Sequence, residues 1–312
     1  MFFKIALKHF PFNQPFTTTV QNKRATISLS KLPELLFTYI EVESYLRSAL
    51  IRFNPCIAEN PAHADTVIYK LRALISTVRP HDLVTQNERF KKLIFEENSF
   101  PFDKDGRSIS IRFFDYDNPE NNHFVVTNQW VYPQKVGGKR LDVVLLINGF
   151  PVAIGEMKSP VRPAISWMDG AGDILNYEKS IPEMFVTNIF NFATEGKGFR
   201  YGAINAPVTL WGPWYADIPH EEGDFSKVQK SVASITRQEV ILDLFRCFTL
   251  FSTDKHIIVS PGSSQVSISD SPRRPGDTGS RAFLPEYCHG IASRHGCGRK
   301  SPARPRIPPP FS

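Results

Sequence analysis

Two acidic residues and a lysine near the middle of the chain have the types and spacing of a phosphodiesterase site. Asp142 lies in one apolar run, and Glu156 and Lys158 follow 14 and 16 positions later in a second run. Two carboxylates that face each other can hold a hard divalent cation. Lys158 shares a strand face with Glu156 and can reach toward a metal-bound water. A cation there polarises a scissile phosphate and lowers the pKa of the water bound to the cation. The pattern therefore predicts metal-dependent phosphodiester hydrolysis.

The connection between the two runs decides whether this site can form. Asn148-Gly149 between them predicts a hairpin turn. A tight two-residue turn would pair Asp142 with Gly155 and send Glu156 to the opposite face of the sheet. A three-residue loop, or a bulge at Gly149, would bring the two carboxylates together. We therefore predict an odd-length loop, and a two-residue turn with the carboxylates on opposite faces would exclude the nuclease interpretation.

The Glu-x-Lys triplet is not specific by itself. A second copy, Glu195-Gly196-Lys197, lies in a glycine-flanked loop with no acid on a preceding strand. Glu156 and Lys158 instead end an apolar strand, where unpaired charges are costly and usually signify function. The structural alternative for them is a solvated salt bridge at a strand end.

Apolar residues with alternating helical and strand periods surround the site and predict the elements that position it. Two runs, Leu141–Ile147 and Phe150–Met157, are apolar on both faces, which is typical of central strands covered on both sides. The pattern predicts an α/β fold. Helices are expected within 30–96 (including 64–75 and 87–96), over 164–177 and over 228–251, and strands over 109–113, 123–126, 141–147, 150–157, 184–189 and 201–204.

The charge of the chain does not by itself identify a partner. The 312 residues carry a net charge of +6 and are 41% hydrophobic, which is ample for a sizeable core. Residues 261–312 contribute +5 of that charge, so 1–260 carry only +1. Bulk charge is therefore no evidence for nucleic-acid binding, and only a local site can argue for it.

The cysteines and the hydropathy indicate the cellular setting. Cys56, Cys247, Cys288 and Cys297 have no paired spacing, which fits a reducing cytoplasm. The longest uncharged apolar run, between Asp142 and Glu156, has 13 residues and is too short to cross a bilayer. We therefore expect a cytoplasmic protein without a membrane span.

Several segments around these residues resemble the N-terminal nuclease domain of the restriction (R) subunit of type I restriction-modification enzymes. The resemblance covers about 87–251. It is carried by Asn128-Gln129-Trp130, Arg140–Pro151 and Glu156–Pro160, and it continues through Tyr177, Pro182, Phe185, Asn188, Tyr201-Gly202 and Trp211.

The resemblance implies a PD-(D/E)xK nuclease core, a mixed sheet flanked by helices, with an N-terminal helical part. Asp142 and Glu156 would be metal-binding carboxylates, Lys158 the catalytic lysine, and the Met157 carbonyl a further ligand for Mg²⁺ or Mn²⁺. The implied activity is that of a type I site-specific deoxyribonuclease. The implied partners are double-stranded DNA and the methyltransferase and specificity subunits.

The chain departs from the family at a Gln-x-x-x-Tyr motif on the helix after the core strands. Here the equivalent residues are Asp173 and Tyr177, so the tyrosine is present and the glutamine is not. An acid repels a phosphate where an amide would donate a hydrogen bond. Activity is reduced by this change, or Asp173 binds metal instead. The pair can equally be an ordinary helix face packed on the sheet.

A second departure is the absence of a Gly-rich phosphate loop, with which the translocase of this family begins. We therefore expect no ATP binding. Residues after about Ser260 are rich in Pro, Ser and Arg, which predicts disorder and an out-of-frame or unrelated ending on a truncated subunit. The chain then divides into 1–98, a mainly helical part of the nuclease domain; 99–220, the nuclease core; 221–260, a helix and linker toward the absent motor; and 261–312, a non-native tail.

Other charged residues near the site have weaker interpretations. Lys135, Lys139 and Arg140 form a basic loop that suits contact with the DNA backbone, although a solvated hairpin tip is favoured on frequency alone. Arg140 could also pair with Asp142. Glu88 could point toward the metal, but a solvated helix face is favoured.

Two other functions remain open from the residues alone. One is a repair or junction nuclease with the same core, which would cut according to DNA structure. The other is a catalytically silent remnant that binds DNA or the methyltransferase partner, favoured by Asp173, the missing motor and the tail.

Overall fold

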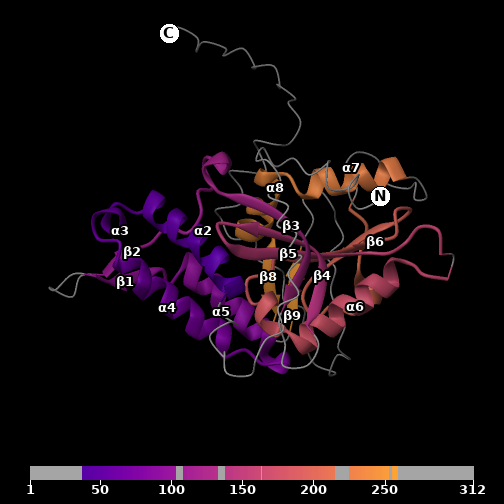
Figure 1. Cartoon of the computed structure of the whole chain (residues 1–312), viewed down its shortest axis with the longest axis horizontal. Helices are drawn as coiled ribbons and strands as arrows, with labels where there is room; N and C mark the ends of the chain where they lie inside the picture. Colours follow the sequence, from indigo (N-terminus) through magenta and orange to yellow (C-terminus); the bar gives the residue numbers. More distant parts are fainter. Residues whose placement is uncertain are drawn as a thin grey trace, which may run out of the picture. The chain divides into compact units, whose positions relative to one another are not determined.

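A five-stranded mixed sheet forms the centre of the computed structural model, which describes residues 37–102, 108–132, 138–162, 164–214, 225–252 and 255–258 (Figure 1). Its order is β3-β4-β5-β6-β7, and all neighbours are antiparallel except β5 and β6, which are parallel. The strands are β3 (Phe124–Tyr132), β4 (Lys139–Ile147), β5 (Phe150–Met157), β6 (Phe190–Thr194) and β7 (Phe199–Gly202). The expected α/β architecture with a mixed sheet is confirmed.

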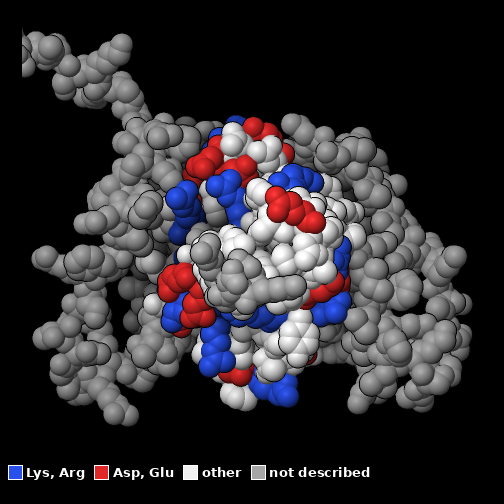
Figure 2. All heavy atoms as spheres, turned by 90° about the vertical axis from the view of Figure 1, so that its left-hand side faces the viewer, with Lys and Arg blue, Asp and Glu red and all other residues white. Residues whose placement is uncertain are grey.

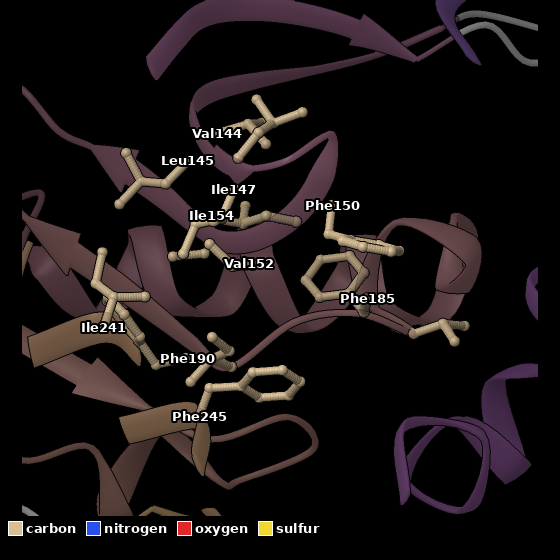
Figure 3. Packing of buried hydrophobic residues seen from close by; sticks show 14 of the residues in the cluster. Val144, Leu145, Ile147, Phe150, Val152, Ile154, Phe185, Phe190, Ile241 and Phe245 are labelled. Carbon is tan, nitrogen blue, oxygen red and sulfur yellow. The ribbon is translucent and has the colours of Figure 1, made fainter. Parts of the chain in front are cut away.

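The central strands β4 and β5 are buried because their side chains are apolar on both faces. Every β4 side chain from Val143 to Ile147 is at most 2% exposed. Figure 3 shows residues of β4 and β5 packing with Phe190 of β6 and with Phe245 from the C-terminal part of the chain. Phe150 also contacts Phe90, with ring centroids 5.3 Å apart. Covering both faces of these strands explains the run of apolar residues without alternation.

Helices from the N-terminal part of the chain share this core. They are α2 (Phe37–Phe53), α3 (Pro55–Glu59), α4 (His63–Ser76) and α5 (Leu83–Phe95), and they gather beside the sheet (Figure 1). Asn87 of α5 is buried and donates to the carbonyls of Val186 and Asn188, at 2.8 and 2.9 Å. These bonds tie α5 to the chain that leads into β6.

The helix α6 (Trp167–Ser180) connects the parallel strands β5 and β6 and packs on both. It begins with a capping box between Ser166 and Asp169. Gly170 weakens helix propensity, but a Cβ there would lie only 3.2 Å from Ala193 Cβ and 3.3 Å from Glu156 Cβ. Glycine therefore allows α6 to approach the sheet closely, beside Glu156.

Three sequence predictions of secondary structure are wrong in their detail. The predicted strand over 109–113 ends early, since β2 (Ser108–Ser110) stops and Ile111 and Phe113 are buried outside a strand. The predicted strand over 184–189 is a 3-10 turn (Pro182–Phe185) and a loop. A fully buried apolar run has no hydrophobic period, so the sequence cannot distinguish a buried strand from such a turn. The predicted helix over 228–251 is two helices, α7 (Phe225–Ile235) and α8 (Gln238–Cys247), followed by β8 (Thr249–Ser252).

Short elements complete the described chain. They are β1 (Ser99–Pro101), which pairs with β2, β9 (Lys255–Ile258), which pairs with β8, and the 3-10 turns Pro80–Asp82, Pro119–Asn121 and Val208–Leu210. The predicted tail 261–312 and the predicted helix start near Ser30 lie outside the described residues.

The surface of the described chain carries both signs of charge. On the face shown in Figure 2, lysine and arginine side chains lie among aspartate and glutamate side chains. None of the described helices has the length and apolar character needed to cross a membrane.

Replacing Gly149 with alanine should lower the free energy of unfolding by about 2 kcal/mol. Gly149 has φ +86°, and a Cβ there would lie 2.2 Å from the carbonyl oxygen of Val42 in α2. Urea unfolding of the two proteins measures the difference. The matched control is Gly172→Ala in α6, where a Cβ would meet nothing within 4 Å, and which should be neutral or stabilising. Equal stability of G149A and the parent would contradict the close approach of α2 to the turn.

Candidate active site

The β4–β5 hairpin brings Asp142 and Glu156 together by a route that differs from the prediction. Ile147 pairs with Phe150, so the loop is the two-residue turn Asn148-Gly149, with φ of +50° and +86°. The prediction of an odd-length loop is therefore wrong. Both central residues have positive φ, as a type I′ turn requires, and Asn and Gly are the residues that tolerate it.

A bulge in β5 then restores the register that the turn alone would have lost. Leu145 pairs with Ala153 and Leu146 with Pro151, so Val152 is an extra residue in β5. Beyond the bulge Val143 pairs with Gly155, and the next residues, Asp142 and Glu156, lie opposite each other. The carboxylates share one face of the sheet, and the outcome that would have excluded a nuclease does not occur.

Hydrogen bonds between neighbouring strands hold the two acids in place. The backbone N–H of Asp142 donates to Glu156 Oε1 at 3.4 Å, and the N–H of Met157 donates to Asp142 Oδ2 at 3.1 Å. The other oxygen of Asp142 accepts from Gln129 Nε2 of β3 at 2.8 Å. Sequence reasoning used Gln129 only as part of the resemblance, since no local pattern indicates its contact with Asp142.

Glu156 is buried and carries an unusual pKa. Its side chain is only 4% exposed. Burial first, and then repulsion from the Asp142 carboxylate, raise the pKa of Glu156 to about 8. A bound cation would favour the ionised form of both acids, because its positive charge would offset the repulsion between the two carboxylates.

Lys158 follows β5 directly and places its ammonium among the acids. Its N–H donates to the carbonyl of Thr194 at 2.8 Å, which continues the pairing with β6. Its Nζ forms an ion pair with Asp173 Oδ2 of α6 and lies 3.7 Å from Glu156 Oε2. Burial alone would lower the pKa of Lys158, but the hydrogen bond to Asp173 and the charge of Glu156 outweigh it and raise the pKa. The lysine therefore stays cationic.

Tyr177 lies one helical turn after Asp173 and faces the same site. Its hydroxyl donates to the carbonyl oxygen of Arg140 at 3.4 Å. Burial, and then the charge of Glu156, raise the pKa of Tyr177, so its hydroxyl keeps its proton. The structure thus brings together, near the C-terminal end of β5, the residues Asp142, Glu156, Lys158, Asp173 and Tyr177.

The predicted basic loop is described only in part. Lys135 lies outside the described residues. Lys139 Nζ lies 5.9 Å from the centre of the Tyr177 ring, a cation–π distance. Arg140 is exposed, and within the described part of the chain it forms no ion pair with Asp142.

Two other acids have structural roles. Glu195 of the second Glu-x-Lys triplet accepts from the N–H of Trp167, at the start of α6, at 3.0 Å and from the N–H of Gly198 at 3.1 Å. Glu88 pairs with Lys92 on the exposed face of α5, with an Oε1–Nζ distance of 2.8 Å. The favoured interpretation of Glu88 as a solvated helix face is confirmed.

The donor set at the site fits a hard cation with few protein ligands. Among the described residues no group of three or more His, Cys, Asp or Glu side chains is arranged to hold a metal ion. Mg²⁺, however, is commonly bound by one or two carboxylates, with water and substrate phosphate completing its octahedron. The opposed carboxylates of Asp142 and Glu156 meet that requirement.

If the site hydrolyses DNA as the resemblance implies, replacing Asp173 with glutamine should raise the rate of metal-dependent cleavage about tenfold. Lys158 must break a partly exposed ion pair with Asp173, worth up to about 1 kcal/mol, before it can reach a phosphate. The substitution also removes a negative charge that repels DNA. Plasmid cleavage rates measure the change.

The matched control for D173Q is Glu88→Gln, which removes one acid and one Glu–Lys pair on α5. This variant should cleave like the parent. A lower rate for D173Q would contradict the prediction and would indicate that Asp173 holds the lysine or the metal in place.

Comparisons with known proteins show which family the chain belongs to. The chain matches the family described as "Type I restriction enzyme R protein N terminus" over residues 22–208. It is 28% identical over 216 residues to the "Type I restriction enzyme HindI endonuclease subunit" of Haemophilus influenzae, covering 67% of this chain and 20% of that protein. It is 26% identical over 190 residues to the "Putative type I restriction enzyme MjaIXP endonuclease subunit" of Methanocaldococcus jannaschii, covering 58% and 18%.

The matches cover most of this chain but only a small part of its relatives. The chain spans about a fifth of the length of the curated relatives it matches. The family match covers more than half of the chain and includes Asp142, Glu156, Lys158, Asp173 and Tyr177. This chain therefore belongs to the family of type I restriction enzyme R protein N-termini.

Proposed function

We propose that this chain is a metal-dependent DNA endonuclease domain that hydrolyses phosphodiester bonds as part of a type I restriction enzyme R subunit. The observation that carries the proposal is the pair of opposed carboxylates, Asp142 and Glu156, with the Lys158 ammonium beside them. The α/β core is taken to be of the PD-(D/E)xK class, with the domain boundaries at 98, 220 and 260 given above.

Each site residue has a role in this proposal. Asp142 and Glu156 hold Mg²⁺ or Mn²⁺, with the carbonyl of Met157 as a further ligand. When bound, this ion polarises the scissile phosphate and lowers the pKa of the attacking water. Lys158, which stays protonated, stabilises the negative charge that develops on the phosphate oxygens.

Residues around this centre support it. Tyr177 keeps its proton and can donate to a phosphate oxygen. Asp173 holds Lys158 until DNA binds. Lys135, Lys139 and Arg140 contact the DNA backbone, where they neutralise phosphates without reading sequence.

The wider assembly is part of the proposal as well. Double-stranded DNA is the substrate, the methyltransferase and specificity subunits are the partners, and the choice of sequence belongs to those partners. We expect this chain alone to cut without sequence preference and without ATP hydrolysis.

The test is nicking of supercoiled plasmid by the full 312-residue chain at micromolar concentration with Mg²⁺ or Mn²⁺. Asp142→Ala and Lys158→Ala are the control variants. Metal-dependent nicking that is lost in both controls would support the proposal. Nicking that survives in both would place the activity elsewhere and contradict it.

A catalytically silent remnant is the second candidate, and the ion pair between Lys158 and Asp173 favours it. In that case the parent chain binds DNA without cutting it. Asp173→Gln then decides between the two candidates, because a domain held back only by Asp173 gains activity when the acid is removed. A folded D173Q chain that still does not cut would support the remnant.

A further inference from the structure

The pairing of β3 with β4 is interrupted at the residue of β3 that lies opposite Asp142. Asn128 pairs with Val143 and Trp130 pairs with Leu141, but the pair between them, Gln129 and Asp142, is missing from the ladder. The register is the same on both sides, so no residue has been inserted. Only the backbone of Gln129 is turned out of the regular strand conformation, with φ of +54°.

This conformation is unfavourable for glutamine. Positive φ crowds the Cβ against the backbone, and Asn, Asp and Gly adopt it more readily than longer residues. Among the described non-glycine residues only Asn148, Asn205 and Gln129 have positive φ, and the two asparagines are of the tolerant type. Asn148 is also part of a tight turn, whereas Gln129 lies within a strand. The strain at Gln129 therefore has no local explanation.

The contact that the strained residue makes offers an explanation. Gln129 Nε2 donates to Asp142 Oδ1 at 2.8 Å, while the N–H of Met157 donates to Asp142 Oδ2 at 3.1 Å. The carboxylate is thus held from both neighbouring strands, one oxygen by β3 and the other by β5. With both oxygens fixed, the Asp142 side chain cannot rotate freely.

We infer that Gln129 is a positioning residue for Asp142, and that the irregular backbone of β3 serves to aim its amide at this carboxylate. Strained backbone that persists beside a functional group commonly serves that group. Hydrogen bonds that orient a ligating carboxylate typically change metal affinity by 10–100-fold when they are removed. Gln129 touches neither metal nor DNA in this role and acts only through Asp142. The inference rests on the proposed function of Asp142 as a metal ligand.

The experiment separates the amide from the backbone strain. Mn²⁺ binding to the full chain without DNA is measured by titration calorimetry for the parent, Gln129→Gly and Gln129→Ala, and stability is measured by urea unfolding. Glycine removes the amide and relieves the positive φ, whereas alanine removes the amide and keeps the strain. We expect both variants to bind Mn²⁺ about 10–100-fold more weakly than the parent. We also expect Q129G to have a higher urea midpoint than Q129A.

Two control variants make the result specific. Asn128→Ala changes the neighbouring residue of β3, which keeps its place in the ladder, and it should leave Mn²⁺ affinity unchanged. Asp142→Ala should abolish binding and so shows that the measured ion is at this site.

The outcomes distinguish this inference from the proposed function. Parental Mn²⁺ affinity in Q129G, together with loss of binding in D142A, overturns the role of Gln129 and leaves the metal site in place. Weakened binding in a Q129G chain that is as stable as the parent supports the inference, because a purely structural role would lower stability instead. No Mn²⁺ binding to the parent chain overturns both.

Discussion

Replacing Glu156 with glutamine should reduce metal-dependent DNA cleavage about a thousandfold and, at the same time, stabilise the metal-free protein at alkaline pH. The loss of cleavage follows because the amide has no charge with which to hold a divalent cation. The gain in stability follows because Glu156 is 4% exposed and its ionised form is costly to bury.

The sign of the pH effect comes from the raised pKa of Glu156, which is about 8 in the folded protein. The pKa of an unfolded glutamate is about 4.3. A group whose pKa is raised on folding contributes stability that is fully present below the unfolded value and is lost as the pH rises through the folded value. The parent should therefore lose stability between about pH 5 and pH 9 without metal, and E156Q should lose less.

Urea unfolding at pH 5 and pH 9, with and without Mg²⁺, measures this difference, and plasmid nicking measures the activity. Mg²⁺ should restore the stability of the parent at pH 9 and leave E156Q unchanged, because only the parent has the ionised pair. Glu195→Gln in the other Glu-x-Lys triplet is the matched control. It should keep cleavage and lose some stability, since Glu195 accepts two backbone hydrogen bonds. Cleavage by E156Q at the rate of the parent would show that Glu156 is not needed for the reaction.

The second large effect concerns Glu178, a buried acid of α6 that lies outside the proposed active site. Its side chain accepts from Asn191 Nδ2 at 3.1 Å and from the N–H of Asn205 at 2.9 Å. Burial raises the pKa of Glu178 to about 8 despite these bonds. Replacing Glu178 with glutamine therefore changes the free energy of unfolding differently at the two ends of the pH range. The change should be about 3 kcal/mol more favourable at pH 9 than at pH 5.

Neighbouring amides can adapt to glutamine at position 178. Asn191 Oδ1 accepts from Asn188 Nδ2 at 2.9 Å, and Asn188 Oδ1 is buried without a hydrogen-bond donor in the described part of the chain. If the side-chain amides of Asn188 and Asn191 each rotate by 180°, the new amide at position 178 donates to Asn191, and Asn191 donates to Asn188. The network then keeps its bonds with the direction reversed.

Thermal or urea unfolding of the parent and E178Q across this pH range tests the prediction. Lys197 is exposed and is not among the charges that act on Glu178, so Lys197→Gln is a control that should have little effect on the pH profile. Parallel stability curves for E178Q and the parent would show that Glu178 titrates at an ordinary pKa, in contradiction to its burial. Nicking by E178Q should be close to that of the parent, because the hydrogen bonds of Glu178 go to Asn191 and Asn205 and not to residues of the site.

Residue types and their spacing were sufficient to predict the location of the candidate site and the kind of fold that holds it. The apolar runs over 141–147 and 150–157, each of which contains one acid, predicted two central strands and the two carboxylates of the site. Those patterns are local, because burial on both faces of a strand selects residue types at every position. The resemblance found in the same residues also led to the correct family.

The register of the hairpin and the contacts between distant elements could not be predicted from the sequence. A two-residue turn at Asn148-Gly149 predicts a register in which the site cannot form, and the bulge at Val152 that restores the register has no signal of its own in the sequence. The bond between Lys158 and Asp173, and the strained backbone of Gln129 beside Asp142, join elements that are apart in the chain. Hydrophobic periodicity reports which residues are buried, but register and strain depend on which strands and helices meet, and that is a property of the whole packed core.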